Sequence, residues 1–375
     1  MKIPFNRPWI EQTELDALSA VIKEGRIGGN GPVCHEVERM LGEMVRVGHA
    51  LLMTSCTHSL ETAIRVLGLS TGDQVIIPSF AFPSAANAVL LCGAETVMAD
   101  IRRDTLNIDP EDIERKITRR TRAVIPVHYA GISCDMGRIM DLAAAHGLKV
   151  VEDAAQCIGS AYRDQPLGSI GDIGCMSFHE TKNVVCGEGG AFFTSDEELF
   201  HRAEIFREKG TNRSRFLAGD IDKYSWIDLG SSFVLSDILA ALLRTQLGKL
   251  EAITGQRARI HRRYDEGLKG LADSGKIRLG QIPQDYRANY HIYYFLVEGG
   301  GRDTCLARLQ EAGIRATTHF YPLHLSEMGK RMGSREGDLP VTEEVFRKLI
   351  RLPIYPGLED SQVDYVIDVL QGILN

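Results

Sequence analysis

Lys149-Val150-Val151-Glu152-Asp153-Ala154-Ala155-Gln156 begins as an apolar run of strand length and ends with polar side chains. Similar short apolar runs lie on either side of it, at 50–53, 74–77, 95–99, 123–126, 174–178 and 190–194. Helix-like stretches separate or follow these runs, at 57–67, 82–92, 110–117, 135–146 and 196–208. Strands that alternate with helices predict a parallel sheet with helices on both faces. The sequence therefore indicates an α/β fold.

The pattern changes after the last of these elements. The stretch 234–269 has no proline and is helix-like throughout, so we expect one long helix that leads out of the first domain. Beyond it, a strand and two helices are predicted, at 290–297, 303–312 and 360–374. We predict a large domain, 1–245, with a mostly parallel central sheet, and a smaller mixed α/β domain, 246–375.

Composition and charge exclude several classes of protein. Of 375 residues, 44% are apolar and 25% are charged, which is typical of a globular chain. The net charge of −7 gives no indication of a nucleic-acid partner. We find neither an apolar run long enough to cross a membrane nor a signal-peptide pattern at the N-terminus. The eight cysteines form no C-x-x-C pair, so we expect reduced thiols, no metal site and a cytoplasmic protein.

Two acids stand at the end of the strand that opens this section. Ligands of open α/β sheets bind beyond the carboxyl ends of the strands. Side chains alternate along a strand, so Glu152 and Asp153 should point to opposite faces, and one of them is a candidate ligand contact. The alternative is a helix cap or a surface acid.

A lysine follows a later strand in a similar way. The run Gly174-Cys175-Met176-Ser177-Phe178 leads through His179-Glu180-Thr181 to Lys182, and the glycine-rich stretch 187–190 comes next. A single lysine is usually a solvated surface charge. This one stands just after a strand and just before a tight glycine turn, where backbone can approach a ligand closely.

The third candidate element is rich in hydroxyl groups. Met53-Thr54-Ser55-Cys56-Thr57-His58-Ser59 joins a strand to a helix. The free amides of a helix N-terminus, together with hydroxyl donors, bind phosphate. The alternative is ordinary capping of the helix by Ser55 or Thr57.

Together the three elements predict a site for pyridoxal 5′-phosphate (PLP). This cofactor requires a lysine for its aldehyde, an acid for its ring nitrogen and a pocket for its phosphate. An ionised Asp153 would favour the protonated ring, which stabilises negative charge on the substrate. Lys182 could then move the proton as general base and acid.

Motifs over nearly the whole chain carry a family resemblance. They are residues 3–8, 28–32, 127–131, 152–156, 177–183, 187–190, 319–324 and 352–358. As a set they resemble the DegT/DnrJ/EryC1/StrS family of nucleotide-sugar aminotransferases. The resemblance implies PLP-dependent fold type I, similar to aspartate aminotransferase, and a homodimer whose active sites lie at the subunit interface.

The resemblance also implies roles for single residues. Lys182 binds the PLP aldehyde as a Schiff base and Asp153 pairs with the ring nitrogen. The other cofactor contacts that it implies are Cys56, Thr57, Phe82, Gln156, Ser177 and Ser232. Phe82 would stack on the ring, with core packing as the alternative, and Ser232 stands where many relatives have asparagine. His319, Tyr321 and His324 are candidate substrate contacts, with a buried turn as the alternative. Arg213 and Lys223 are candidate contacts for the diphosphate or the donor carboxylate, with a solvated loop as the alternative.

Two segments, 207–214 and 222–232, resemble members that aminate a dTDP-sugar. They imply transfer of an amino group from L-glutamate to C4 of dTDP-4-keto-6-deoxyglucose. The alternatives are another ketosugar, with a C3 keto group or the opposite stereochemistry at C4, a sugar dehydratase, and a non-catalytic binding protein. Sugar dehydratases of this family replace the lysine by histidine, and a binding protein should have lost the lysine or the aspartate. The presence of Lys182 and Asp153 disfavours both.

Overall fold

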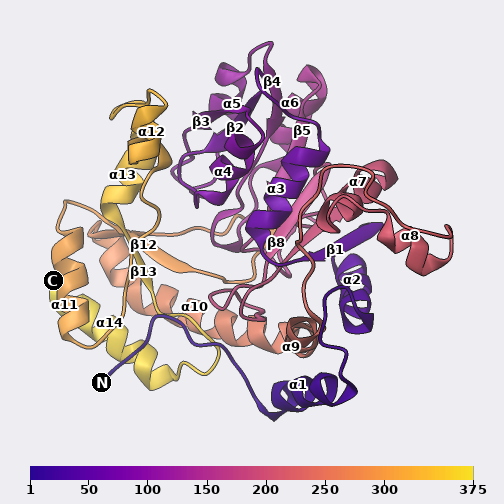
Figure 1. Ribbon diagram of the computed structural model, residues 1–375. Helices are drawn as coiled ribbons and strands as arrows, with labels where there is room; N and C mark the ends of the chain where they lie inside the picture. Colours follow the sequence, from indigo (N-terminus) through magenta and orange to yellow (C-terminus); the bar gives the residue numbers. More distant parts are fainter. Residues whose placement is uncertain (375) are drawn as a thin grey trace.

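A central sheet of seven strands organises the protein. The computed structural model describes residues 1–374, with residue 218 by its backbone alone (Figure 1). The strand order is β1-β9-β8-β5-β4-β2-β3. The bounds are β1 His49–Met53, β2 Gln74–Pro78, β3 Glu95–Ala99, β4 Thr121–Val124, β5 Lys149–Asp153, β8 Ile173–Ser177 and β9 Gly190–Thr194. Only β9 runs antiparallel to its neighbours, so the prediction of an α/β fold with a mostly parallel sheet is confirmed.

Helices cover both faces of this sheet. They are α2 Pro32–Val45, α3 Cys56–Val66, α4 Ser84–Leu91, α5 Pro110–Lys116, α6 Met136–His146, α7 Glu197–Arg207 and α9 Asp237–Gly248. Successive strand residues point to different sides: Val150 packs in the cluster with α2, α6 and α9, and Val151 packs in the cluster with α3, α4 and α7. This alternation explains why the strands read as continuous apolar runs in the sequence.

A second, smaller sheet lies in the C-terminal part. Strands β10 Ile277–Leu279, β12 Tyr293–Val297 and β13 Leu349–Leu352 pair antiparallel, and three helices pack beside them: α10 Leu250–Asp273, α11 Arg302–Glu311 and α14 Asp360–Leu374. Ile3, near the N-terminus, belongs to the same hydrophobic cluster and pairs with Ile314. In Figure 1 the N-terminal segment accordingly runs beside the orange and yellow elements.

The remaining elements are short or flank the two sheets. They are α1 Gln12–Glu24, β6 Ala161–Tyr162, β7 Gln165–Pro166, α8 Arg213–Ala218, β11 Tyr286–Arg287, α12 Glu327–Arg331, α13 Pro340–Lys348 and the 3-10 turns Tyr129–Gly131 and Leu323–Leu325. Strands β11, β6 and β7 form a third small sheet. Among the helices of residues 1–374, none is long and apolar enough to cross a membrane.

Two predicted elements differ from the structure. The expected helix 234–269 is two helices, α9 and α10, because Lys249 leaves helical geometry between them and its amine binds Glu14 at 2.6 Å. The expected strand 290–297 begins only at Tyr293, since Tyr290 has a left-handed backbone with φ 55°. The predicted domain boundary at 245 falls inside α9, and the division into 1–245 and 246–375 stays a proposal.

Candidate active site

Strand ends bring the candidate residues to one edge of the central sheet. Asp153 ends β5 and Ser177 ends the neighbouring β8, while Lys182 follows β8 in the turn before β9. Helix α3 begins at Cys56, just after β1. A Cβ on Gly190, the first residue of β9, would lie 2.4 Å from the Cys56 nitrogen, so only glycine lets this strand approach the start of α3.

The two adjacent acids have different surroundings, as alternation predicts. Glu152 is completely buried and accepts hydrogen bonds from His128 Nε2 at 2.9 Å and from the backbone amides of Gly168, Ile170 and Gly171 at 2.6–2.9 Å. Burial alone would raise the pKa of Glu152, but the hydrogen bonds from His128 and the backbone outweigh it and lower the pKa. Glu152 is therefore a structural acid that holds the loop at 168–171.

Replacing Glu152 by glutamine should destabilise the fold by roughly 3 kcal/mol, because the amide cannot accept all four hydrogen bonds. Urea unfolding of the cofactor-free protein measures this loss. The folded-state pKa is lowered, so the stabilisation is full above the ordinary carboxyl pKa and disappears as the pH falls through the lowered one. The difference in the free energy of unfolding between wild type and Glu152→Gln should therefore become smaller at acid pH. Glu43→Gln, which changes an exposed ion pair, should cost under about 0.5 kcal/mol; equal losses for the two variants would contradict the structural role.

Asp153, in contrast, keeps most of its capacity for hydrogen bonds unused. Its side chain is 7% exposed, and its one hydrogen bond within residues 1–374 comes from the Ala155 amide at 3.1 Å. Burial raises the pKa of this carboxyl, opposed by the Ala155 hydrogen bond and by the charge of Lys182. A buried acid with an open face beside a lysine is suited to pair with a cation such as a protonated pyridine nitrogen.

Lys182 lies within electrostatic reach of that acid. Burial lowers the pKa of its amine, and attraction to Cys56 and Asp153 opposes the shift. The amine makes no hydrogen bond to any side chain or carbonyl in the described part of the chain. The turn that carries it is anchored instead by Asn183, which donates to the Asn289 carbonyl at 2.8 Å and contacts His291 Nδ1 at 2.8 Å. A fixed turn with a free, desolvated amine is what a nucleophilic lysine requires.

The start of helix α3 has the features of a phosphate site. Ser55 is the N-cap and accepts from the His58 amide at 3.1 Å, so the alternative of capping holds for Ser55 and not for Thr57. The amides of Cys56 and Thr57 stand in the first turn, where a helix offers no partner of its own. The Thr57 hydroxyl bonds to the Ser84 hydroxyl at 2.7 Å, which adds a second donor group. These groups fit a phosphate dianion.

The other predicted cofactor contacts are placed around these three elements. Phe82 is 63% exposed, which contradicts the alternative of core packing, whereas Phe80 is 1% exposed and takes that core position. Gln156 accepts from the Ala130 amide at 2.6 Å, and the Ser177 hydroxyl accepts weakly from the His179 amide at 3.4 Å. Ser232 is exposed and pairs through its backbone with Glu208.

The candidate substrate contacts divide into three groups. His319 is half-buried beside Arg351, and Tyr321 is 58% exposed. His324 is 1% exposed, with its ring nitrogens bonded to Ser79 at 2.7 Å and Glu343 at 3.2 Å, which supports the alternative of a buried turn. Arg213 lies 3.9 Å from Glu208, and Lys223 is exposed. Among the residues that the structure describes, neither Arg213 nor Lys223 forms a hydrogen bond or ion pair with Lys182.

Several residues near the lysine escaped the sequence reasoning. His291 was part of the predicted strand 290–297 and Asn289 stands just before it, yet both residues anchor the lysine turn. Arg351 stands immediately before the motif 352–358 that carried the family resemblance, and Arg257 lies on α10. The available signal was the arginine inside the apolar run Leu349-Ile350-Arg351-Leu352, since a charge at a buried strand position is rare without a function.

Comparison with known proteins gives the family. The model of the DegT/DnrJ/EryC1/StrS aminotransferase family matches residues 8–371. The chain belongs to this family. Among its relatives is the Bacillus subtilis spore coat polysaccharide biosynthesis protein SpsC, 33% identical over 99% of this chain and 97% of that protein.

Solved structures of the family superpose over the full length. DesV of S. venezuelae, solved with a ketimine intermediate, has a TM-score of 0.92 at 33% identity and covers 100% of this chain and 99% of its own. Streptococcus pneumoniae Spr1654 has been solved in PLP and PMP forms; its PMP form has a TM-score of 0.92 at 29% identity and covers 100% of this chain and 98% of its own. The aminotransferase fold inferred from the sequence is thereby confirmed.

Proposed function

We propose that this family member is a PLP-dependent aminotransferase that moves the amino group of L-glutamate to C4 of dTDP-4-keto-6-deoxy-D-glucose. The products are dTDP-4-amino-4,6-dideoxy-D-galactose and 2-oxoglutarate. The observation that carries the aminotransferase chemistry is the convergence of Lys182, Asp153 and the start of α3 at one sheet edge. The choice of sugar rests on the resemblance of segments 207–214 and 222–232 to enzymes of that specificity.

Each residue of the site has a definite task. When bound, PLP supplies an electron sink that stabilises negative charge on the carbon bearing the amino group. Asp153 would hold the ring nitrogen in its protonated state. The amides of Cys56 and Thr57 and the Thr57 hydroxyl would hold the phosphate. Lys182 Nζ would hold the aldehyde and, when free of it, would move a proton as general base and acid. Its lowered pKa favours the unprotonated amine that this task requires.

We also propose a homodimer with active sites shared across the interface. An exposed apolar group in segment 213–229 supports it: Leu217 is 58%, Trp226 77% and Leu229 55% exposed. Sedimentation as a monomer at assay concentration would speak against shared sites. A cytoplasmic location is proposed from the eight free cysteines.

The function is tested by mixing the protein with PLP, L-glutamate and a panel of dTDP- and UDP-ketosugars. We expect 2-oxoglutarate to form with dTDP-4-keto-6-deoxyglucose, and NMR of the product to show an axial amino group at C4, the galactose configuration. If 2-oxoglutarate forms only with a 3-keto sugar, the proposed substrate is wrong but the aminotransferase activity stands. If the product carries an equatorial amine at C4, the proposed product is wrong and the activity again stands. No 2-oxoglutarate with any ketosugar would remove the activity itself.

Phe82→Ala should weaken PLP binding about tenfold, because the exposed ring is available to stack on the cofactor. Fluorescence titration of the cofactor-free protein with PLP measures this change. The unfolding temperature of the cofactor-free variant should equal that of wild type, since little of the ring is buried. Phe80→Ala is the matched comparison, and it should destabilise the fold by about 3–5 kcal/mol. Unchanged PLP affinity in Phe82→Ala would exclude the stacking role.

A further inference from the structure

Asn289 is a buried residue whose side chain bonds only to backbone groups. It is 0% exposed and belongs to the irregular stretch between β11 and β12. Its side-chain nitrogen donates to the carbonyls of Gln156 at 2.8 Å and Ile158 at 2.9 Å. Its side-chain oxygen accepts from the backbone amide of His291 at 3.1 Å. The side chain thus fixes its own segment against the turn that follows Asp153.

The backbone of the same residue holds the turn that carries the lysine. The Asn289 carbonyl accepts from the Asn183 side chain at 2.8 Å, and Asn183 is the residue directly after Lys182. On the other side of the link, Gln156 comes three residues after Asp153. Two hydrogen-bonded steps therefore join the lysine turn to the turn of the acid, and both of them pass through Asn289.

A third turn closes around Asn289 and leaves it little room. The Asn289 backbone amide donates to the Ser160 hydroxyl at 3.1 Å, and this hydroxyl donates to the Gly131 carbonyl at 2.7 Å. Gly131 has a φ of 79°, and a Cβ on it would overlap the side-chain oxygen of Asn289. Only glycine permits so close an approach, so the position of Asn289 is defined on this side as well.

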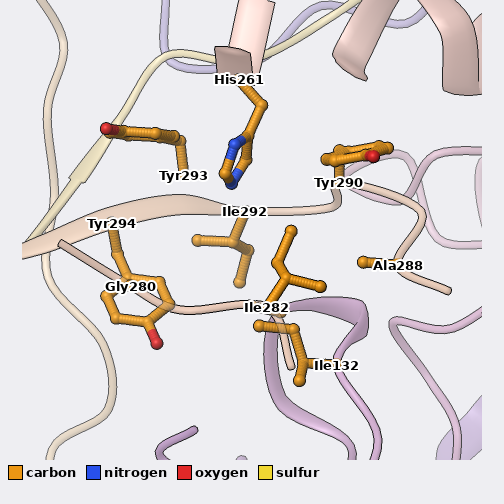
Figure 2. A pocket seen from close by; sticks show the side chains of 10 residues that line it. Ile132, His261, Gly280, Ile282, Ala288, Tyr290, Ile292, Tyr293 and Tyr294 are labelled. Carbon is orange, nitrogen blue, oxygen red and sulfur yellow. The ribbon is translucent and has the colours of Figure 1, made fainter. Parts of the chain in front are cut away.

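Apolar neighbours press the Asn289 segment against the same turn. Ala288 and Ile292 belong to one hydrophobic cluster with Ala130 and Ile132. Figure 2 shows the side chains of Ile132 and Ile292 close together, with Ala288 on the same stretch of chain as Ile292. Since packing holds the segment on both sides of Asn289, its hydrogen bonds have a fixed geometry.

A second buried asparagine makes the same kinds of hydrogen bond and provides a comparison. Asn107 is 1% exposed, and its side-chain nitrogen donates to the carbonyls of Ile132 at 3.0 Å and Ser133 at 2.8 Å. Its side-chain oxygen accepts from the Tyr129 amide at 2.8 Å. Within the described part of the chain, Asn107 has no hydrogen bond to the lysine turn. The two asparagines therefore differ in what they connect and not in how they bond.

We propose that Asn289 is a positioning residue that sets where the amine of Lys182 lies relative to Asp153. This inference rests on the proposed function. Both groups must reach one cofactor, the amine at its aldehyde and the carboxylate at its ring nitrogen. Among residues 1–374 the amine has no hydrogen bond of its own, so the turn alone determines its position. An error of about 1 Å in such an arrangement costs roughly 100-fold in rate.

The first test uses the cofactor-free protein and needs no substrate. Acetylation of Lys182 by acetic anhydride, followed over pH by peptide mass spectrometry, gives the pKa of this amine whatever its accessibility. Burial lowers that pKa in the wild type. In Asn289→Ala the turn loosens and water reaches the amine, so the midpoint of the pH profile should move upward.

Asn107→Ala is the matched control for this measurement. Both substitutions leave two buried carbonyls and one buried amide without a partner, so urea unfolding should show a loss of stability in both variants. Asn107→Ala should nevertheless keep the wild-type midpoint of acetylation, because it does not touch the lysine turn. A merely structural role of Asn289 would leave the midpoint unchanged in both variants.

The second test measures the two half-reactions of the PLP-loaded enzyme. In the first, L-glutamate converts the PLP form to the PMP form, followed by the loss of PLP absorbance; in the second, the PMP form reacts with the ketosugar. Lys182 serves both, so Asn289→Ala should lower both maximal rates about 100-fold and leave both half-saturating concentrations within about twofold of wild type. Asn107→Ala should keep both rates within about twofold of wild type.

A double variant tests whether Asn289 acts through the lysine turn. Asn183→Ala cuts the same link at its other end. It should shift the acetylation midpoint upward by itself, which keeps the test decisive if Asn289→Ala does not fold. Combining the two substitutions should cost no more rate than the larger single loss, because a link that is already cut has nothing further to lose.

Three outcomes would overturn the inference: an unchanged acetylation midpoint in Asn289→Ala and Asn183→Ala, equal losses of rate in Asn289→Ala and Asn107→Ala, or losses that multiply in the double variant. The proposed function fails separately, if wild type converts neither glutamate nor ketosugar. The acetylation profiles would still decide whether Asn289 positions the amine.

Discussion

Lys182→Ala should lose at least about 10⁴-fold in turnover while the protein remains folded. The substitution removes both the amine that holds the PLP aldehyde and the group that moves the proton, and proton transfer alone contributes about 10²–10⁴-fold. Steady-state formation of 2-oxoglutarate measures the loss. Borohydride reduction followed by peptide mass spectrometry should find PLP on residue 182 of wild type and on no lysine of the variant.

The stability of the cofactor-free Lys182→Ala protein, unlike its turnover, should not fall. Since burial lowers the pKa of Lys182, its charge costs stability, and the amine has no hydrogen bond to lose. The cofactor-free variant should therefore unfold at the same or a higher temperature than the cofactor-free wild type. Lys269→Ala, on the exposed side of α10, should leave turnover and unfolding unchanged. Appreciable turnover by Lys182→Ala would refute the assigned role.

Asp153→Asn should slow conversion of the PLP form by L-glutamate about 10³-fold. Asparagine keeps the size and the acceptor for the Ala155 amide but cannot hold the ring nitrogen protonated. Loss of one partner of a buried ion pair costs about 3–5 kcal/mol, which corresponds to this factor in rate. Stopped-flow absorbance measures the rate, and titration with PLP should also show weaker binding. Full activity in this variant would exclude the pairing with the ring nitrogen.

The pH dependence of folding distinguishes Asp153 from its neighbour. Its folded-state pKa is raised, so ionisation costs the cofactor-free protein stability once the pH exceeds the ordinary carboxyl value, and the cost is absent below it. Cofactor-free Asp153→Asn should match or exceed wild type in stability at neutral pH, with the difference vanishing in acid. Glu152→Gln should instead be less stable than wild type at neutral pH, because the lowered pKa of Glu152 means that its ionised form stabilises the fold. The same behaviour in both variants would contradict the opposite roles of the two acids.

The central sheet was predictable because strands β2, β5, β8 and β9 are buried on both faces and are therefore nearly continuous apolar runs. The predicted bounds of 190–194 agree with β9, and those of 95–99 agree with β3, an edge strand that is only partly buried. The break between α9 and α10 was not predictable, because it depends on the ion pair of Lys249 with Glu14, more than 200 residues away. Local periodicity contains no information about such a contact.

The candidate site was predictable where a residue follows a strand, as Asp153 and Lys182 do. The alternation of side chains predicted that Glu152 and Asp153 point to opposite faces, but not which of them is open to a ligand. In the structure the loop at 168–171 donates its amides to Glu152 and so leaves Asp153 as the open acid. Arg351 was missed because the sequence does not show that this buried arginine has no ion pair with an acid of residues 1–374. The absence of such a partner is visible only after folding has brought the acids to their places.

The pairing of Ile3 with Ile314 has a consequence for synthesis of the protein. The first residues leave the ribosome early, yet their partner strand segment is translated 311 residues later (314 − 3). At about 5–20 residues per second, the N-terminal segment waits roughly 15–60 s without its partner. During this interval Arg351 does not exist yet, so the contact of the Phe5 ring with its guanidinium forms only when the nascent chain is almost complete.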